Sequence, residues 1–491
     1  MEQADVVVVG SGPNGMAAAV TMARGGLEVL VIEGQETIGG GARTLDLGLE
    51  VGMRHDVCSA VHPMALASPF LRDFDLRARG VELAVPELSY AQPLDGGRVG
   101  LAWHDLDRTV AGLGVDGSAW RSLFEPLVER SDAVVALSMG DKRSVPRELM
   151  DGASGLRAAL GLARGILTQG TRAWNRAFED DVAPALLTGV AAHAIAPVPG
   201  LAPAGAALLL ATLAHSVGWP IPIGGSQAII DALVADLRAH GGGLRTGAPV
   251  SSWRELPAAR AYLLDTSPRA AAEIWGDLLP PRAVRSLRRF RYGDAAAKVD
   301  FVLSGPVPWE TPETGQAGTV HVGGTRVEMA AAESSVAAGR HAEQPMVLLS
   351  DPTTADPGRE LGGLRPLWTY AHVPHGSDRD VTEDVTRQIE RFAPGFRDLV
   401  VASRCVPAAE MERHNANYIG GDIATGAVTV PRMLTGVRPA WNPYEVGVPG
   451  VYLCSSSVPP GPGVHGMGGW FAARHALRQR FGISRPPVLA P

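Results

Sequence analysis

Three glycines and one acid near the start of the chain have types and spacing suited to holding a ligand. Gly10, Gly12 and Gly15 form a G-x-G-x-x-G pattern, and Glu33 follows one predicted strand later. In this pattern the first glycine permits a tight turn, the second lets a pyrophosphate approach the backbone, and the third lets a helix pack closely on a strand. An acid at the position of Glu33 can accept hydrogen bonds from ribose hydroxyls. We therefore predict a dinucleotide site, whose members here are Gly10, Gly12, Pro13, Asn14, Gly15 and Glu33.

The segments around these residues have the pattern of a strand, a turn, a helix and a second strand. Residues 5–9 (DVVVV) are apolar and β-branched, as in buried parallel strands. Residues 16–24 are predicted to form a helix, and residues 27–32 (LEVLVI) a second strand. The helix N-terminus would offer free N–H groups and the positive end of its dipole to phosphates. This order of elements favours a dinucleotide site over a surface loop with chance glycines.

The C-terminal region predicts a second element of the same kind. Residues 451–454 (VYLC) read as a strand, a glycine-rich loop follows, and a helix is predicted from about residue 470 to 480. Upstream, residues 228–239 read as a helix, residues 244–253 (LRTGAPVSSW) as a strand and residues 262–266 as another. A strand, a glycine-rich turn and a helix again present backbone N–H groups to a negatively charged ligand.

Composition limits the class of protein. The chain has 491 residues, 46% of them hydrophobic and 19% charged, which indicates a globular protein with room for more than one domain. Its net charge of −7 gives no electrostatic case for nucleic acid or anionic lipid as a partner. The three cysteines are far apart, so neither a metal site nor a redox-active dithiol is encoded. No signal peptide precedes the first predicted strand, and a cytoplasmic location is expected.

Residues 39–44 (GGGART) carry a family resemblance. They resemble the G-G-x-x-R-[ST] extension of the flavin amine oxidase and phytoene desaturase superfamily, which implies FAD as the dinucleotide. Many amine oxidases have Arg directly after the glycine pair, where this chain has Gly41, so Arg43 would supply the positive charge instead. The members of the FAD site that the resemblance implies here are Gly40, Gly41, Ala42 and Arg43.

Three further segments share the resemblance. Residues 414–423 (HNANYIGGDI) are similar to a segment of the bacterial phytoene-desaturase-related branch, which includes pyridine nucleotide-disulfide oxidoreductase domain-containing protein 2. The backbone near Val250 is expected beside the adenine, and the C-terminal glycine loop beside the flavin ring. Many members have Gly-Asp where this chain has Ser455-Ser456, which puts the usual Asp contact in doubt. The FAD-site residues implied here are Val250, Ser455, Ser456, Val464, His465 and Gly466.

Two side chains are candidates for catalysis. In flavin amine oxidases a lysine on a strand of the substrate domain holds a water at flavin N5, and Lys298 lies in a loosely similar sequence context. The alternative places Lys298 on a solvated edge strand. His465 lies in the C-terminal glycine loop, where it could act as acid or base, contact the substrate, or be merely structural.

The resemblance covers about the whole chain and implies an α/β fold. A Rossmann-type, GR2-like FAD-binding domain is expected in residues 1–75, 221–290 and 410–491. An inserted α+β substrate domain is expected in residues 76–220 and 291–409. Its antiparallel sheet is predicted from a hairpin within residues 81–104 and from alternating patterns at residues 295–303, 318–322, 346–350 and 366–372, and an amphipathic helix is predicted at residues 381–392.

Residues 105–220 are predicted to be mostly helical, and residues 201–214 (LAPAGAALLLATLA) are the most apolar stretch. A buried helix is the default interpretation, because the stretch is too short to span a membrane. A membrane-surface patch and the lining of an apolar substrate tunnel stay open as alternatives. The apolar stretch leaves peripheral membrane contact possible. The sequence is also compatible with a homo-oligomer.

The sequence contains no second G-x-G-x-x-G unit and no pair of neighbouring cysteines. A disulfide reductase needs a nicotinamide domain and a dithiol beside the flavin, so this class is excluded. The first hypothesis is an FAD-dependent desaturase or dehydrogenase of an apolar, isoprenoid- or polyene-like small molecule, with hydride transfer to flavin N5. A flavin amine or amino-acid oxidase is the second. The third is a redox-neutral flavin isomerase or a flavin-binding interaction protein. The electron acceptor is left open, with oxygen and quinone as candidates.

Overall fold

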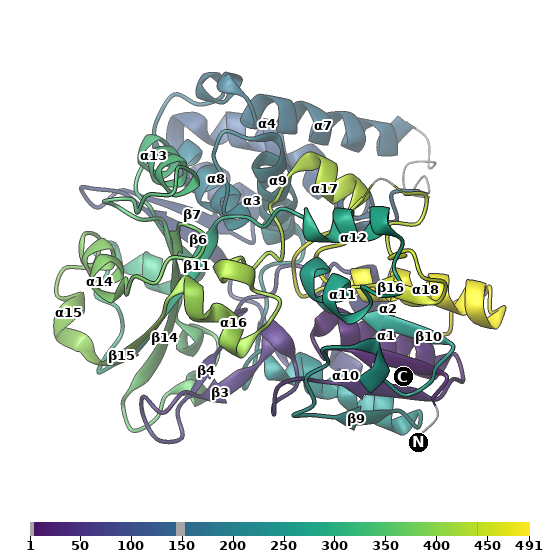
Figure 1. Cartoon of the computed structure of the whole chain (residues 1–491). Helices are drawn as coiled ribbons and strands as arrows, with labels where there is room; N and C mark the ends of the chain where they lie inside the picture. Colours follow the sequence, from purple (N-terminus) through teal and green to yellow (C-terminus); the bar gives the residue numbers. More distant parts are fainter. Residues whose placement is uncertain (1–3, 144–152, 439) are drawn as a thin grey trace.

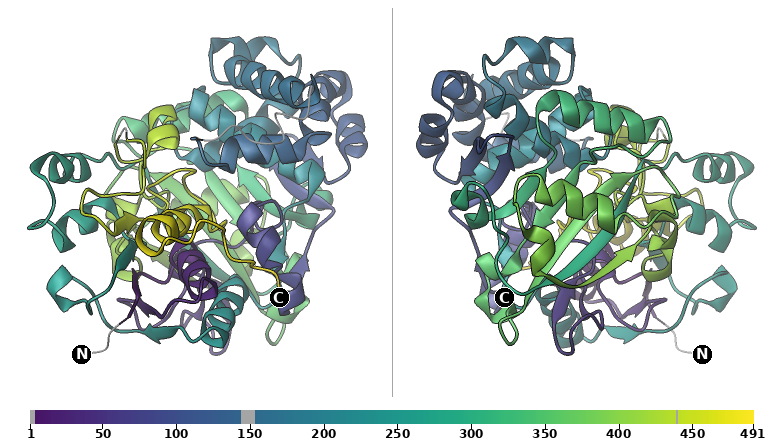
Figure 2. Two further views of the ribbon diagram at one scale, coloured as in Figure 1. Left: turned by 90° about the vertical axis from the view of Figure 1, so that its right-hand side faces the viewer. Right: turned by 90° about the vertical axis from the view of Figure 1, so that its left-hand side faces the viewer.

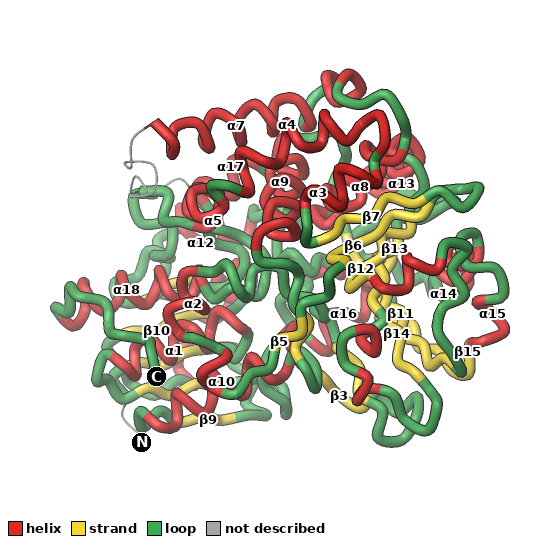
Figure 3. The backbone as a smooth tube through the Cα atoms, turned by 180° about the vertical axis from the view of Figure 1, so that it is seen from behind, coloured by secondary structure: helices red, strands yellow, loops and turns green. Residues whose placement is uncertain are grey.

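Two large β-sheets organise the computed structural model, which describes residues 4–143, 153–438 and 440–491. One sheet is parallel and has five strands, and the other is mixed and has seven. In Figure 1 the parallel sheet and its helices lie at the lower right, the mixed sheet lies at the left, and a group of helices crosses the top. Figure 3 shows the same two groups of strands from behind.

The parallel sheet joins strands from three distant parts of the chain. Its strand order is β16-β10-β1-β2-β9, and each neighbouring pair is parallel. The strand predicted over residues 244–253 is shorter than expected, because only its first residues pair with β2. The strands are β1 (Val6–Val9), β2 (Val29–Ile32), β9 (Gly243–Arg245), β10 (Ala261–Leu264) and β16 (Val451–Leu453).

Three helices accompany this sheet: α1 (Pro13–Arg24), α10 (Gln227–Ala239) and α18 (Met467–Phe481). Helix α1 packs against both α10 and α18. It begins three residues earlier than the sequence predicts, because Pro13 suits the first position of a helix, where its fixed φ fits and its missing N–H costs nothing. The short helices nearby are α2 (Pro69–Phe74), α11 (Pro268–Ile274) and α12 (Pro281–Arg288).

The mixed sheet has the strand order β15-β11-β14-β13-β12-β6-β7. All its pairs are antiparallel except β6 with β12, so the predicted antiparallel sheet contains one parallel pair. The strands are β6 (Leu88–Pro93), β7 (Val99–Trp103), β11 (Ala295–Leu303), β12 (Ala317–Val322), β13 (Val347–Ser350), β14 (Arg365–Val373) and β15 (Val400–Val406).

The two faces of the mixed sheet have different neighbours, because successive strand residues point to opposite sides. On one face Val299, Phe301 and Leu367 pack with residues of helix α14 (Thr382–Glu390). On the other face Trp368 and Tyr370 pack toward the interior of the molecule. Helices α13 (Arg326–Ala337), α15 (Phe396–Leu399) and α16 (Met411–His414) lie around this sheet.

The helices across the top come from residues 105–220, as predicted. Both views of Figure 2 show them gathered at one end of the molecule. Helix α9 contains the apolar stretch of residues 201–214 and is largely buried, but α8 is the more apolar of the two. The helices across the top are α3 (Leu106–Gly112), α4 (Gly117–Val128), α5 (Ser131–Met139), α7 (Ala153–Gln169), α8 (Val182–Ala191) and α9 (Leu201–Ser216), with α17 (Val430–Thr435) from the C-terminal part beside them. Residues 144–152 of the predicted helical region lie outside the described residues.

These observations confirm the predicted α/β class, the Rossmann-type parallel sheet and the separate sheet with antiparallel pairing. The exact domain boundaries stay a prediction. In the described part of the chain, no helix combines the length and the apolar character needed to cross a bilayer.

Candidate functional site

A single large cavity connects the glycine turn after β1 with the apolar helices α7 and α9. Its volume is about 790 Å³, which is in the usual range for small-molecule and cofactor sites. Thirteen of the predicted site residues line it: Gly10, Gly12, Pro13, Asn14, Glu33, Gly40, Gly41, Arg43, Val250, Ser455, Ser456, Val464 and His465. Gly15, Ala42, Gly466 and Lys298 do not, and each has another place in the structure.

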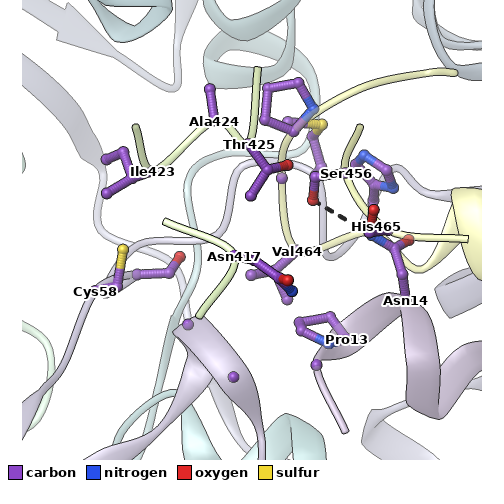
Figure 4. A pocket seen from close by; sticks show the side chains of 18 of the residues that line it. Pro13, Asn14, Cys58, Asn417, Ile423, Ala424, Thr425, Ser456, Val464 and His465 are labelled. Carbon is purple, nitrogen blue, oxygen red and sulfur yellow. Dashed lines mark hydrogen bonds between the residues drawn. The ribbon is translucent and has the colours of Figure 1, made fainter. Parts of the chain in front are cut away.

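The glycine turn has the geometry that the sequence predicts. Gly10 has a φ of +96°, which is open to glycine, and a Cβ on Gly15 would lie 2.2 Å from the carbonyl oxygen of Gly10. Gly15 is therefore needed for packing at the start of α1, and its role is structural rather than as a surface for the ligand. Figure 4 shows Pro13 and Asn14 of this turn at the edge of the cavity.

Glu33 lines the cavity at the end of β2 and also holds the glycine turn. Its Oε2 accepts hydrogen bonds from the backbone N of Ser11 at 2.8 Å and from Ser11 Oγ at 2.6 Å, and its Oε1 accepts one from Gln35 N at 2.9 Å. The carboxylate is half-buried. Glu33 can thus accept hydrogen bonds from a ribose while it fixes the loop that faces the phosphates.

Asp265 is a site residue that sequence reasoning missed. It follows β10, lines the cavity, and accepts a hydrogen bond at Oδ2 from Gly15 N at 2.9 Å. Burial raises the pKa of this carboxyl to about 6. The nearby negative charge of Glu33 also raises it, whereas the backbone hydrogen bonds that the carboxyl accepts lower it. A polar residue directly after a parallel strand was the available signal, because ligands bind at the carboxyl ends of such strands.

The second glycine segment explains the departure from the family pattern. A Cβ on Gly41 would lie 2.1 Å from the hydroxyl oxygen of Tyr418, so an arginine has no room at this position. Arg43 is buried, and its guanidinium donates to the carbonyl oxygen of Gly40 at 2.8 Å and to the carbonyl of His414. Ala42 is packed in the hydrophobic core and does not reach the cavity.

The segment of residues 414–423 contributes directly to the site. Asn417 donates from Nδ2 to the carbonyl oxygen of Asp265 at 2.9 Å and accepts at Oδ1 from Ser267 N at 2.7 Å. Asn417 lines the cavity and is labelled in Figure 4. It ties this segment to the carboxyl end of β10, a contact that no local sequence pattern could reveal.

Ser455 and Ser456 of the C-terminal loop both line the cavity and are tied to neighbouring segments. Ser455 Oγ donates to the carbonyl oxygen of Thr266 at 2.7 Å, and Ser456 Oγ accepts from Asn14 Nδ2 at 3.4 Å. Gly466 has a φ of +69° at the start of α18, and a Cβ there would lie 2.6 Å from the Phe70 ring. Gly466 therefore packs between helices and is not a surface for the ligand.

The residues present fit FAD. Gly12 and Gly40 leave the backbone bare where the two glycine segments meet, since a Cβ on Gly40 would lie 3.0 Å from the Gly12 Cα. Glu33 is placed for the adenosine ribose, and Val250 lines the same end of the cavity. Residues 8–74 match the family model for an NAD(P)-binding Rossmann-like domain.

The fold matches solved flavin-type oxidases along nearly its whole length. Wild-type putrescine oxidase has a TM-score of 0.61 at 17% identity, covering 98% of this chain and 100% of that one. Cyclohexylamine oxidase from Brevibacterium oxydans has a TM-score of 0.59 at 15% identity, covering 99% and 100%. The chain has the fold of an FAD-dependent oxidoreductase.

Relatives found by sequence also match nearly the whole length of this chain. Pyridine nucleotide-disulfide oxidoreductase domain-containing protein 2 from Mus musculus is 23% identical over 96% of this chain and 93% of its own length. An uncharacterized protein from Mycobacterium tuberculosis is 24% identical over 96% and 97%. These comparisons confirm the predicted resemblance and FAD as the cofactor, and they establish an oxidoreductase fold without specifying the substrate.

His465 lines the cavity with both ring nitrogens in use. Nδ1 accepts from Met467 N at 3.0 Å, and Nε2 lies 3.2 Å from the carbonyl oxygen of Gly461. Burial lowers the pKa of His465 to about 4, so the ring is neutral near pH 7. These contacts give His465 a structural role in its loop, and a catalytic role for it stays a prediction. Figure 4 shows the ring beside Asn14 and Ser456.

Lys298 is buried in the mixed sheet, so the solvated edge-strand alternative is wrong. It lies on β11, between β14 and β15, and its side chain is 3% exposed. Its ammonium pairs with Asp300 and lies 5.2 Å from the centroid of the Trp368 ring. Lys298 lies on the same face of the sheet as Trp368 and Tyr370, which line the cavity, although Lys298 itself is not among the lining residues. A catalytic role for Lys298 stays a prediction.

Proposed function

We propose that the chain oxidises an apolar small molecule, as an FAD-dependent desaturase or dehydrogenase of isoprenoid- or polyene-like substrates. The continuity of the cavity carries this proposal. From the glycine turn it extends past Trp368 and Tyr370 to apolar residues of α7 and α9, among them Leu162, Leu209 and Leu210. A ligand bound along this path would have one part at the cofactor and the rest among hydrocarbon side chains.

The residues of the chain would supply binding, orientation and exclusion of water. FAD, when bound, supplies the acceptor for a hydride. The turn after β1, Glu33 and the C-terminal loop would hold the cofactor at one end of the cavity. The buried, apolar side chains of α9 would hold the substrate and keep water away from the reacting carbon.

The charges on the cavity wall disfavour a cationic substrate. Among the described residues that line it, the only acids are Glu33 and Asp265, and both lie at the dinucleotide end. An ammonium group in the apolar part would therefore have no carboxylate partner, and its desolvation would be costly. This observation supports an apolar substrate over a cationic amine.

A flavin amine or amino-acid oxidase is the second candidate. The similarity in fold to putrescine oxidase and cyclohexylamine oxidase supports it, as does the buried ion pair of Lys298 beside the cavity wall. A redox-neutral isomerase or a flavin-binding interaction protein would use the same cofactor end without net oxidation of a substrate.

Anaerobic bleaching of the flavin tests these alternatives. The holoprotein would be mixed with a polyene, an isoprenoid alcohol, putrescine and cyclohexylamine, with oxygen or a quinone added afterwards. We expect bleaching by an apolar compound and recovery with one acceptor. Bleaching by the amines alone would favour the oxidase, and no bleaching by any of them would favour the non-oxidative alternatives.

A variant that narrows the cavity, with a matched control on the surface, tests where the substrate binds. Ala206 lines the cavity on α9, whereas Leu160 is 61% exposed on α7 and does not line it. We expect Ala206→Phe to abolish bleaching while FAD stays bound, and Leu160→Phe to leave it unchanged. Equal bleaching in both variants would mean that the substrate does not use this part of the cavity.

The rim of the cavity supports a peripheral membrane contact for a cytoplasmic protein. Four apolar residues both line the cavity and reach the surface: Leu167, Leu201, Val430 and Leu434. We propose that this rim meets a bilayer, from which an apolar substrate would enter directly. Co-sedimentation with phosphatidylcholine vesicles, lost in Leu434→Glu, tests the contact. A concentration-dependent dimer that the same variant dissolves would point to a second copy of the chain instead.

A further inference from the structure

The apolar part of the cavity contains a buried pair of histidines that the proposed chemistry does not use. Nε2 of His193 lies 2.8 Å from Nε2 of His321, with the two rings at 85°. His193 lines the cavity and is partly exposed, while His321 is fully buried behind it. Burial holds the pKa of His193 down to about 3 and that of His321 well below its ordinary value. Both rings are therefore neutral, and a single proton lies between the two nitrogens.

Gln92 lies close to His321 and favours one arrangement of that proton. Each residue directly follows the paired residues Ala91 and Val320 of the parallel strands β6 and β12. Gln92 Nε2 donates to the carbonyl oxygen of Gly324 at 2.8 Å, which leaves Oε1 as an acceptor without a partner. His321 Nδ1 also has no partner, and both atoms lie within 2.8 Å of the point where a Cβ on Gly189 would stand.

The proton positions follow from this arrangement. Gln92 Oε1 and His321 Nδ1 face the same point without bonding each other, so a proton on Nδ1 avoids two opposed lone pairs and offers Oε1 its nearest donor. His321 Nε2 is then an acceptor, so His193 must donate from its own Nε2. The remaining nitrogen of His193, Nδ1, is left with a free lone pair and has no hydrogen-bond partner among the described residues. A side chain of the cavity wall thus has an unused acceptor in otherwise apolar surroundings.

The backbone beside His193 is strained. Ile195 has a φ of +44°, a conformation that β-branched residues rarely adopt, and Ile195 also lines the cavity. Strain of this kind costs of the order of 1–3 kcal/mol and is found mainly at functional sites. The fold thus maintains a costly turn immediately after the residue that has the free acceptor.

We propose that His193 Nδ1 accepts a hydrogen bond from a hydroxyl group of an otherwise apolar substrate. The proposal rests on the proposed function, since it concerns the substrate end of the same cavity. A hydroxyl fits better than an ammonium group, because the described lining has no acid outside the dinucleotide end. A ketone or an ether would not fit, because it has no proton to donate to Nδ1.

Paired probes test the proposal without requiring turnover. Binding of 1-dodecanol and of dodecyl methyl ether to the holoprotein would be followed by perturbation of the flavin spectrum and by thermal shift. One hydrogen bond to a neutral acceptor predicts that the alcohol binds about 5- to 10-fold more tightly. His193→Phe should remove this preference. Thr319→Val, which removes a hydroxyl from the same cavity wall, should keep it.

Three results would overturn the proposal: equal affinities for the two probes, no binding of either, or a preference that survives in His193→Phe. Ring nitrogen NMR of the wild-type protein labelled with ¹⁵N-histidine checks the proton positions even if the variant does not fold. We expect His193 Nδ1 to be unprotonated, and a protonated Nδ1 would overturn the proposal. Failure of flavin bleaching with every substrate would contradict the proposed function. The binding and NMR results would still test the role of His193, because they do not depend on turnover.

Discussion

At the scale of single residues, Asp265 is the unexpected member of the cofactor site. Its carboxyl lies where the N-terminus of α1 meets the glycine turn, and Gly15 N donates to it. A negative charge there would repel the phosphates of a dinucleotide. Because burial raises the pKa of Asp265 from 3.8 to about 6, the neutral acid is accessible at mildly acidic pH.

The stability of the apoprotein should reflect this shifted pKa. A carboxyl with a raised pKa in the folded state holds its proton while the unfolded chain loses it, so its stabilisation is complete below about pH 4. As the pH rises to about 6, this stabilisation is lost and the free energy of unfolding falls by about 3 kcal/mol. We expect Asp265→Asn to remove this fall while keeping the acceptor for Gly15. Urea unfolding of both apoproteins between pH 4.5 and 7.5 measures the difference, and parallel curves would show that Asp265 does not titrate in this range.

Lys298 is held in the mixed sheet by a buried ion pair with Asp300. Lys298→Met would leave the carboxylate of Asp300 buried beside His55, whose Nδ1 is 3.6 Å from Asp300 Oδ1. Breaking a buried pair from one side costs about 3–5 kcal/mol. We expect Lys298→Met to be destabilised by this amount in urea unfolding, and the double variant with Asp300→Asn to recover most of the loss.

The double variant also tests the catalytic prediction for Lys298. With stability restored, rapid-mixing spectra of flavin reduction and reoxidation would report only on the missing ammonium group. Slower rates in either half-reaction would support a role at the flavin. Unchanged rates would leave Lys298 as a structural residue beside Trp368. A single variant as stable as the wild type would mean that the ion pair contributes nothing to stability.

At the scale of elements, the crossing of α1 and α18 holds the C-terminal loop against the glycine turn. A Cβ on Gly469 would lie 1.8 Å from the carbonyl oxygen of Asn14 and 3.0 Å from Ala18 N. These are backbone atoms, so the helices cannot adapt by moving a side chain. The packing therefore requires a glycine at the point where the helices cross.

Replacing this glycine should separate the two helices. We expect Gly469→Ala to lower the free energy of unfolding by about 1–3 kcal/mol, through overpacking, and to weaken FAD binding. Gly161→Ala on α7 is the matched control, because its Cβ would meet only Leu127 Cδ2 at 3.6 Å. The control should gain up to about 1 kcal/mol from helix propensity. Equal effects of the two changes in denaturation would contradict the close crossing.

At the scale of the whole molecule, the cofactor site joins segments near residues 10, 40, 265, 417 and 456 into one wall. Both cysteines near this wall are poor nucleophiles, because burial raises the pKa of Cys58 and of Cys454. FAD should therefore bind without a covalent bond. Acid precipitation of the holoprotein should release yellow FAD into the supernatant, and flavin that stays in the pellet would show attachment to the chain.

Local sequence determined the dinucleotide half of this protein. The spacing of Gly10, Gly12 and Gly15, the β-branched run before them and Glu33 after β2 each have a local physical reason, so the pattern could be read directly. Six of the seven strands of the mixed sheet were predicted from their apolar runs, whereas the more exposed β15 was not. Lys298 shows the limit of that approach, since its burial depends on the strands on either side.

Only the tertiary structure decided the contacts between distant segments. Tyr418 takes the space that an arginine at position 41 would need, Asn417 ties its loop to Asp265, and His193 meets His321. The residues in each of these contacts are more than a hundred positions apart, so no periodicity or spacing in the chain records them. Their geometry comes from the packing of the two sheets and the helices around one cavity, and burial there sets the charge state of Asp265 and His193.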